Sequence, residues 1–112
     1  MKAYILCLAA LLAGQMITRQ SKPTVRLKPN QPVISVAYGG KLVELLNSGP
    51  TITLPGEPPK VDTQGNPWGV DIKNFGPQAV NIVGNTSFTT TVNVNQTVHI
   101  YSSGSTYILK RQ

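Results

Sequence analysis

The feature that most constrains this chain is the run of short alternating segments in residues 68–110. Apolar and polar residues alternate within each segment, and Asn, Gly, Ser or Pro separates the segments roughly every ten residues. In the first segment Trp68, Val70 and Ile72 share one face of a strand, whereas Asp71 falls on the opposite face. The pattern predicts a small all-β module whose strands each have one buried and one polar face.

Eight strands are predicted, and each supplies only two or three core residues. Gly39 and Gly40 predict a two-residue hairpin turn between the first two strands. Val92 and Val94 are assigned to the inward face. We expect an antiparallel β-sandwich or barrel-like module over residues 33–112, with a core thin enough to be completed by a neighbouring copy. The predicted strands cover residues 33–38, 41–46, 51–54, 68–74, 79–83, 89–93, 97–102 and 106–110.

Residues 1–16 form an apolar segment that begins with one lysine and resembles a secretory signal peptide in layout. The apolar run over residues 3–14 is shorter than the roughly 20 residues that a membrane-spanning helix needs. The single cysteine, Cys7, lies in this run, so no internal disulfide supplements the core. Three interpretations stay open: a cleaved signal peptide, a retained short helix that inserts into a partner or contacts a membrane, and translation that begins at Met16.

Residues 17–32 form a basic arm that contains several prolines. The net charge of +6 is concentrated toward the N-terminus, because residues 1–40 hold five cations and no acid, whereas residues 41–112 hold five cations and four acids. Such an arm binds an acidic protein surface or anionic lipid, or it is a solvated linker. Nucleic acid is disfavoured as a partner because no aromatic residues are interleaved with the charges. The predicted partner-binding residues of the arm are Arg19, Lys22, Arg26 and Lys28.

No residue pattern in the chain predicts catalysis, a cofactor or a metal site. His99 is the only histidine, and its place on the outward face of a strand is typical of a surface histidine. Its one potential thiol partner, Cys7, lies in the N-terminal run. Of the acids that a glycosidase pair would need, Glu57 and Asp62 lie in a proline-rich loop apart from Asp71. We therefore expect a protein without enzymatic activity.

Three aromatic residues form a candidate ligand face. Trp68, Tyr101 and Tyr107 would offer flat rings on which sugars stack, with Asn and Thr nearby as hydrogen-bonding groups. The same residues are also explained as a core tryptophan and cross-strand tyrosines, and we prefer this structural interpretation.

Four short pieces occur in a recognisable order: TITLP at 51–55, IKNFG at 72–76 with Val80 and Ile82 behind it, QTV at 96–98, and YSSGSTYI at 101–108. This order resembles a β module that recurs in bacteriophage fibre and other virion structural proteins. The resemblance covers residues 50–110 and implies a virion component, often trimeric, that decorates a capsid, joins a fibre or contacts the host surface. Tyr107 stands where an aromatic such as tryptophan is usual, and Ser103 replaces a common acid.

Two functions follow as hypotheses from different classes. The leading one is a structural protein of the virion, in capsid decoration or in a head or tail fibre, which forms a homo-oligomer and is tethered to other virion proteins by the arm. The alternative is a secreted or periplasmic β-sandwich that recognises a glycan or surface polymer after removal of a signal peptide.

Overall fold

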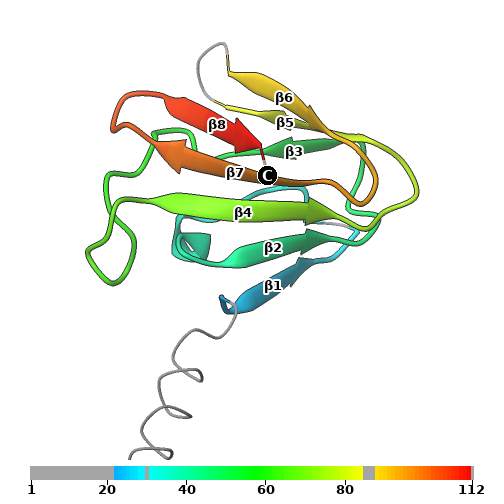
Figure 1. Ribbon diagram of the computed structural model, residues 1–112, viewed down its shortest axis with the longest axis horizontal. Helices are drawn as coiled ribbons and strands as arrows, with labels where there is room; N and C mark the ends of the chain where they lie inside the picture. The colour runs from blue at the N-terminus through cyan, green and yellow to red at the C-terminus, as the bar shows by residue number, and fades with distance from the viewer. Residues whose placement is uncertain (1–21, 30, 85–87, 112) are drawn as a thin grey trace, which may run out of the picture.

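The computed structural model describes residues 22–29, 31–84 and 88–111, which fold into two facing β-sheets (Figure 1). The described part consists of strands and one short 3₁₀ helix, so the prediction of an all-β module is confirmed. The predicted apolar helix within residues 1–16 lies outside the described residues, as does Arg19. The elements are β1 (Thr24–Leu27), η1 (Val36–Tyr38), β2 (Leu42–Leu45), β3 (Thr51–Thr53), β4 (Gly69–Asn74), β5 (Val80–Val83), β6 (Thr89–Val92), β7 (Thr97–Ser102) and β8 (Tyr107–Arg111).

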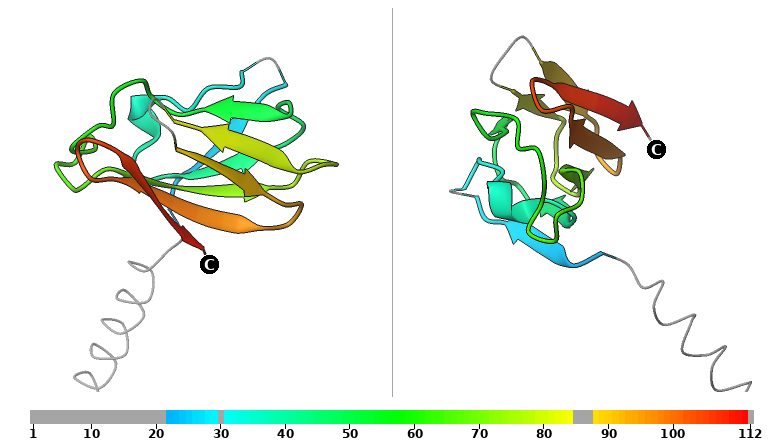
Figure 2. Two further views of the ribbon diagram at one scale, coloured as in Figure 1. Left: turned by 90° about the horizontal axis from the view of Figure 1, so that it is seen from above. Right: turned by 90° about the vertical axis from the view of Figure 1, so that its left-hand side faces the viewer.

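The two sheets have different sizes and both contain parallel and antiparallel pairs. One has five strands in the order β1-β2-β4-β7-β8, and the other has three in the order β3-β5-β6. The pairs β1-β2, β2-β4 and β3-β5 are parallel, whereas β4-β7, β7-β8 and β5-β6 are antiparallel. The prediction of a purely antiparallel module is therefore wrong. Each sheet keeps two edges, so the described residues form an open sandwich and not a closed barrel (Figure 2).

The core lies between the two sheets and follows the alternation of the strands. Along β4 the inward residues are fully buried, whereas Asp71 and Lys73 on the other face are half-buried. Burial of these apolar side chains is the main stabilising contribution that a module of this size has. The buried apolar residues are Leu27, Ile34, Val43, Leu45, Ile52, Leu54, Trp68, Val70, Ile72, Val80, Ile82, Val92, Val98, Ile100 and Tyr107.

Trp68 is the largest side chain of this core, and it ties the loops to the sheet. Its indole Nε1 donates a hydrogen bond to the carbonyl of Val36 at 2.9 Å. Its ring meets that of Tyr107 edge to face, with centroids 6.1 Å apart. The hydroxyl of Tyr107 in turn donates to the carbonyl of Pro55 at 2.6 Å. These contacts join η1, the start of β4, β8 and the proline-rich loop.

Asn74 at the end of β4 is buried and uses all of its amide group. Its Nδ2 donates to the carbonyls of Gln78 at 2.8 Å and Val92 at 3.0 Å, and its Oδ1 accepts from the backbone N–H of Gly76 at 2.9 Å. A buried amide of this kind is stabilising only when each polar atom has a partner. The asparagine and glycine of the sequence IKNFG are therefore the clamp that closes the connection from β4 to β5 and holds it against the end of β6.

Part of the predicted arm is folded into the module. β1 pairs in parallel with β2, and Leu27 is only 1% exposed. The chain then crosses to the other sheet, where the N–H of Ile34 donates to the carbonyl of Thr53 at 2.8 Å. The prediction of an arm separate from the module over residues 17–32 does not hold for Leu27, which is a core residue that follows the strand period.

Two local predictions near the turns are also wrong. Residues 33–38 form no continuous strand: Val33 makes one parallel bridge to Thr53, and η1 follows. The hairpin predicted at Gly39 and Gly40 is consequently a connection from η1 to β2. Val94, assigned to the core, is 42% exposed, because β6 has ended and the chain turns at Asn95, whose φ is +67°.

Candidate functional site

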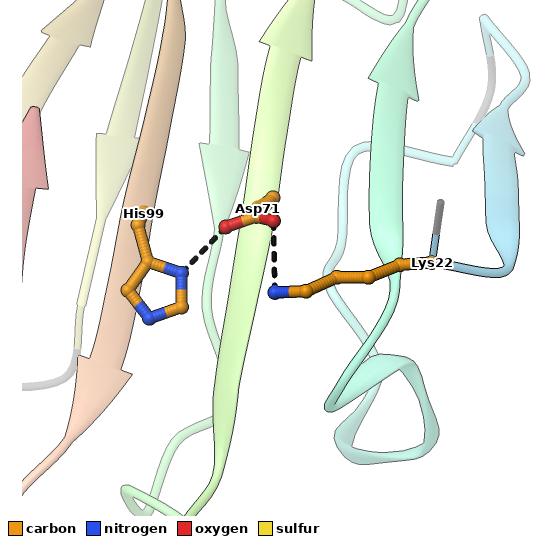
Figure 3. A network of polar contacts seen from close by, with 3 residues as sticks. All are labelled: Lys22, Asp71 and His99. Atoms are coloured by element: carbon orange, nitrogen blue, oxygen red, sulfur yellow. Dashed lines mark hydrogen bonds and ion pairs between the residues drawn. The ribbon is translucent and has the colours of Figure 1, made fainter. Parts of the chain in front are cut away.

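The outer face of the five-stranded sheet carries a row of polar side chains that come from four separate segments. Register places Asp71 on β4 opposite His99 on β7, and His99 opposite Lys110 on β8. Lys22 reaches the same row from the residues just before β1 (Figure 3). Its Nζ lies 2.9 Å from Oδ2 of Asp71, and Nδ1 of His99 lies 2.5 Å from Oδ1 of the same carboxylate. Asp71 therefore stands between two nitrogen donors.

His99 is held in one orientation by its neighbours. Its ring stacks on that of Tyr101, with centroids 5.7 Å apart and planes inclined by 29°. On the next strand Gly69 leaves room for the imidazole, because a Cβ there would lie 3.1 Å from Cε1 of His99. The prediction of an outward-facing histidine is correct, but the ring is less free than a solvated surface group, with its side chain 26% exposed.

The electrostatics of the row depend on Asp71, whose side chain is 15% exposed. Burial by itself would raise the pKa of Asp71. The hydrogen bonds from Lys22 and His99, together with their positive charges, outweigh this effect and hold the pKa below its ordinary value of 3.8. Asp71 is thus a carboxylate at neutral pH and binds the arm through its charge.

A second ion pair links the arm to the sheet one row further along. Nε of Arg26 on β1 donates to Oε1 of Glu44 on β2 at 2.9 Å. Two of the four cations predicted to bind a partner, Lys22 and Arg26, therefore contact acids of the chain's own module. Lys28 is exposed, and the structure gives no placement for Arg19.

The three aromatic residues predicted as a ligand face do not lie on one surface. Trp68 and Tyr107 are buried in the core, with 0% and 4% of their surface exposed, whereas Tyr101 projects from the outer face of the five-stranded sheet and is 37% exposed. The preferred interpretation of Trp68 and Tyr107 as structural residues agrees with this placement. Only Tyr101 remains available to a ligand.

A hollow of about 380 Å³ opens beside the row and combines several positive charges with one carboxylate. Nη2 of Arg111 donates a hydrogen bond to Oγ1 of Thr90 at 3.4 Å. The cations exceed the acid, so the hollow suits an anionic group. In the part of the chain that the structure describes, no hydroxyl or thiol is hydrogen-bonded to His99, as a Ser-His or Cys-His pair would require. The lining residues are Lys22, Asp71, His99, Lys110 and Arg111.

The alternation of the sequence places Asp71 and His99 on outward faces, but it leaves their pairing unspecified because it contains no information on register. Opposite charge at one outward position on each of two strands is the signal that would have suggested the pair. For Lys22, no signal in the sequence marks its contact with β4, since the two lie far apart along the chain.

Across the described ranges, no group of three metal-ligating side chains occurs, and no helix is long and apolar enough to cross a bilayer. Comparison with protein-family models, with curated proteins and with solved structures finds no match for this chain.

Proposed function

We propose that the protein is a non-enzymatic structural component of a virion, in which the β-sandwich is the exposed module and the residues before Lys22 connect it to a partner. The observation that carries this proposal is the docking of the arm. Its described part is built into the module as an edge strand, anchored by Leu27 in the core and by Lys22 and Arg26 on acids of the sheet. A connection made in this way fixes where the chain leaves the module.

The residues that carry the resemblance to virion modules have structural tasks. Asn74 and Gly76 close the connection after β4, and the N–H of Gly104 donates to Oγ of Ser102 at 3.0 Å in the turn between β7 and β8. Gly104 has φ of +95°, a conformation that glycine adopts without strain. Because these residues shape turns, the part of the sequence that resembles virion modules favours a structural role over a ligand-binding one.

The contacts of the arm with the sheet would hold the module in a fixed orientation relative to its partner. Edge-strand hydrogen bonds, a buried leucine and two ion pairs resist displacement together, whereas a solvated linker would let the module rotate freely. We infer that the segment before Lys22 contacts other virion proteins and that copies of the module associate with one another on the particle.

Co-sedimentation of the full chain with particles tests this proposal. Particles from cells that encode the chain are separated on a density gradient, and the intact mass of the chain in each fraction is measured. We expect the chain in the particle fraction at a fixed ratio to the major particle protein. A chain found only in the soluble fractions would contradict the proposal.

A variant pair tests the role of the arm in the same assay. Leu27→Asp places a charge in the core position of β1 and should release the arm, which lowers recovery with particles, whereas Lys28→Ala changes an exposed cation and should not. Amide exchange in β4 and β7 distinguishes a released arm from an unfolded module. Equal recovery of both variants, with the arm released in the first, would contradict the role given to the arm.

A second candidate function is recognition of an anionic polymer by an exported form of the chain. The hollow beside Asp71 supports it, because Lys22, His99, Lys110 and Arg111 gather there next to the exposed ring of Tyr101. Binding to dextran sulfate, with neutral dextran as the matched ligand, tests this function. Lys110→Glu should weaken binding more than Lys60→Glu, a change outside the hollow, and equal effects would contradict it.

A further inference from the structure

The four edge strands of the two sheets differ in how they are protected against pairing with another chain. β1 carries Arg26, and β8 carries Lys110 and Arg111, charges of the kind that discourage edge-to-edge pairing. The edge of β3 is covered, because Thr53 exchanges backbone hydrogen bonds with Pro32 and Ile34. β6 has the sequence TTTV, with four β-branched residues and no charge. No charged residue lies within β6 itself, and only Arg111 of β8 reaches it, at Thr90, so β6 is the least protected edge of the described sandwich.

The backbone groups that β6 presents at this edge follow from the register of its sheet. Within β5, the N–H of Asn81 and the carbonyl of Val83 bond toward β3, so Ile82 is the residue that bonds toward β6. Ile82 lies opposite Thr90. Because bonding alternates along an antiparallel pair, Thr90 is satisfied by β5, and the N–H and carbonyl groups of Thr89 and Thr91 point away from the sheet.

This pattern is self-complementary. We propose that β6 of one copy pairs antiparallel with β6 of a second copy about a twofold axis at Thr90. Thr89 of one copy then lies opposite Thr91 of the other, and each of these two pairs exchanges both of its backbone hydrogen bonds. The two three-stranded sheets become one continuous sheet with the order β3-β5-β6-β6-β5-β3.

The outer-face side chains at this edge agree with the pairing. Thr89 and Thr91 are exposed on the outer face, so the pairing brings threonine opposite threonine, a favourable cross-strand combination. Thr91 Oγ1 donates to Oδ1 of Asn81 at 2.9 Å, which orients its side chain before the second copy arrives. On the inner side, Oγ1 of Thr90 accepts a hydrogen bond from Nη2 of Arg111 of its own copy at 3.4 Å. The pairing therefore brings one guanidinium group from each copy close to the axis, a like-charge contact that opposes the pairing and that salt screens.

The contact between the two β6 strands is small, and we therefore expect it to be weak. One pair of four-residue strands buries less surface than a stable dimer needs, so the twofold contact forms at high concentration or where copies are held close together. A particle surface or a shared anchor would supply that proximity. Pairing through β6 requires only the chain itself in solution and no virion partner. Pairing through β6 gives a dimer with a twofold axis, whereas the resemblance to fibre modules implies a trimer.

Amide hydrogen exchange of the full chain, read at low and high concentration with a reducing agent to keep Cys7 from cross-linking, tests the proposal. We expect the amides of Thr90 and Val92 to be protected at both concentrations, and those of Thr89 and Thr91 to be protected only at high concentration. Sedimentation should show a monomer passing to a dimer below about 1 mM. Absence of dimer up to that concentration, or unchanged exchange at Thr89 and Thr91, would overturn the proposal.

Matched variants separate this contact from association through other parts of the chain. Thr91→Lys puts a charge on the open edge, and Thr91→Pro removes an N–H that β5 does not use, so both should weaken dimerisation at least tenfold with the sandwich intact. Thr51→Lys is the control, since Thr51 lies in the same row on the outer face but on the covered edge. Dimerisation that all three variants leave unchanged, or a trimer in place of the dimer, contradicts pairing through β6.

Discussion

Nζ of Lys22 lies 2.9 Å from Oδ2 of Asp71, and this contact fixes the start of the described arm to the middle strand of the five-stranded sheet. One strand, β2, separates β1 of the arm from β4, so the side chain of Lys22 crosses the outer face of the sheet to reach Asp71. Asp71 also accepts from His99, which joins β7 to the same group. One carboxylate thus connects the arm to the two strands at the centre of the module.

Asp71→Asn should make the stability of the module less dependent on acid pH. Because the pKa of Asp71 is lowered on folding, the carboxylate contributes stability that is present above the unfolded pKa near 4 and is lost as the pH falls through the lower native value. Urea unfolding of wild type and variant at a series of pH values should show a difference at pH 7 that shrinks below about pH 4. Glu57→Gln, which changes an exposed loop acid, is the control. A difference that stays constant down to about pH 2 would contradict this role for Asp71.

Asn74→Ala should destabilise the module by about 3 kcal/mol, because it leaves two buried carbonyls and one N–H without their partner. Asn81→Ala is the matched control: this asparagine is exposed and has one side-chain bond to Thr91, so its loss should cost about 0.5 kcal/mol. Thermal or urea unfolding measures both. If the two variants lost equal stability, the clamp assigned to Asn74 would be incorrect.

Gly39→Ala should displace the indole of Trp68. A Cβ at Gly39 would overlap Cδ1 and Nε1 of the ring, although φ of Gly39 is −53° and alanine adopts that angle readily. Trp68 is the only tryptophan, so its fluorescence reports the change directly, and we expect a shift to longer wavelength and a lower melting temperature. Gly56→Ala, at a position with open space, should alter neither signal. An unchanged emission spectrum in Gly39→Ala would show that the ring is not held there.

Tyr107→Phe should reduce stability near neutral pH and remove part of the alkaline unfolding. Burial raises the pKa of Tyr107 to about 12, so its neutral form contributes stability that is full below pH 10 and is lost as the pH rises through 12. The substitution also leaves the carbonyl of Pro55 without its donor, at a cost of about 1 kcal/mol. Unfolding free energies measured between pH 7 and about pH 11 should converge for the two proteins. If the unfolding free energies of the two proteins stayed a constant distance apart over this pH range, the loss of stability at alkaline pH would come from a group other than Tyr107.

The strands after the long polar loop are the part of the fold that the sequence predicts well. Trp68, Val70 and Ile72 alternate with Asp71 and Lys73, and the structure buries the first three on one side of β4. This prediction succeeds because half-buried strands have a period of two, and the order of apolar and polar residues along the chain shows that period. The buried positions of Tyr107 and of the residues in β7 follow in the same way.

The strand partners and directions could not be predicted from the same pattern. A parallel pair such as β1 with β2 requires a crossover, and side-chain alternation is identical for both directions of pairing. The prolines around β1 indicated a linker, although a strand at a sheet edge tolerates proline beside it. For the candidate site, the alternation of the sequence identifies His99 and Asp71 as outward residues, but their contact depends on the register between two strands, and the two residues are 28 positions apart in the chain.

Electron microscopy of purified particles labelled with gold-conjugated antibody against the full chain tests directly whether the protein is a structural component of a virion. Cells that encode the chain supply the particles, and an immunoblot of the same extract verifies that the chain is present. We predict gold at regular positions on the particle surface, as expected of a structural module held by an anchored arm. Unlabelled particles in a preparation whose soluble fraction contains the chain would contradict the proposed function.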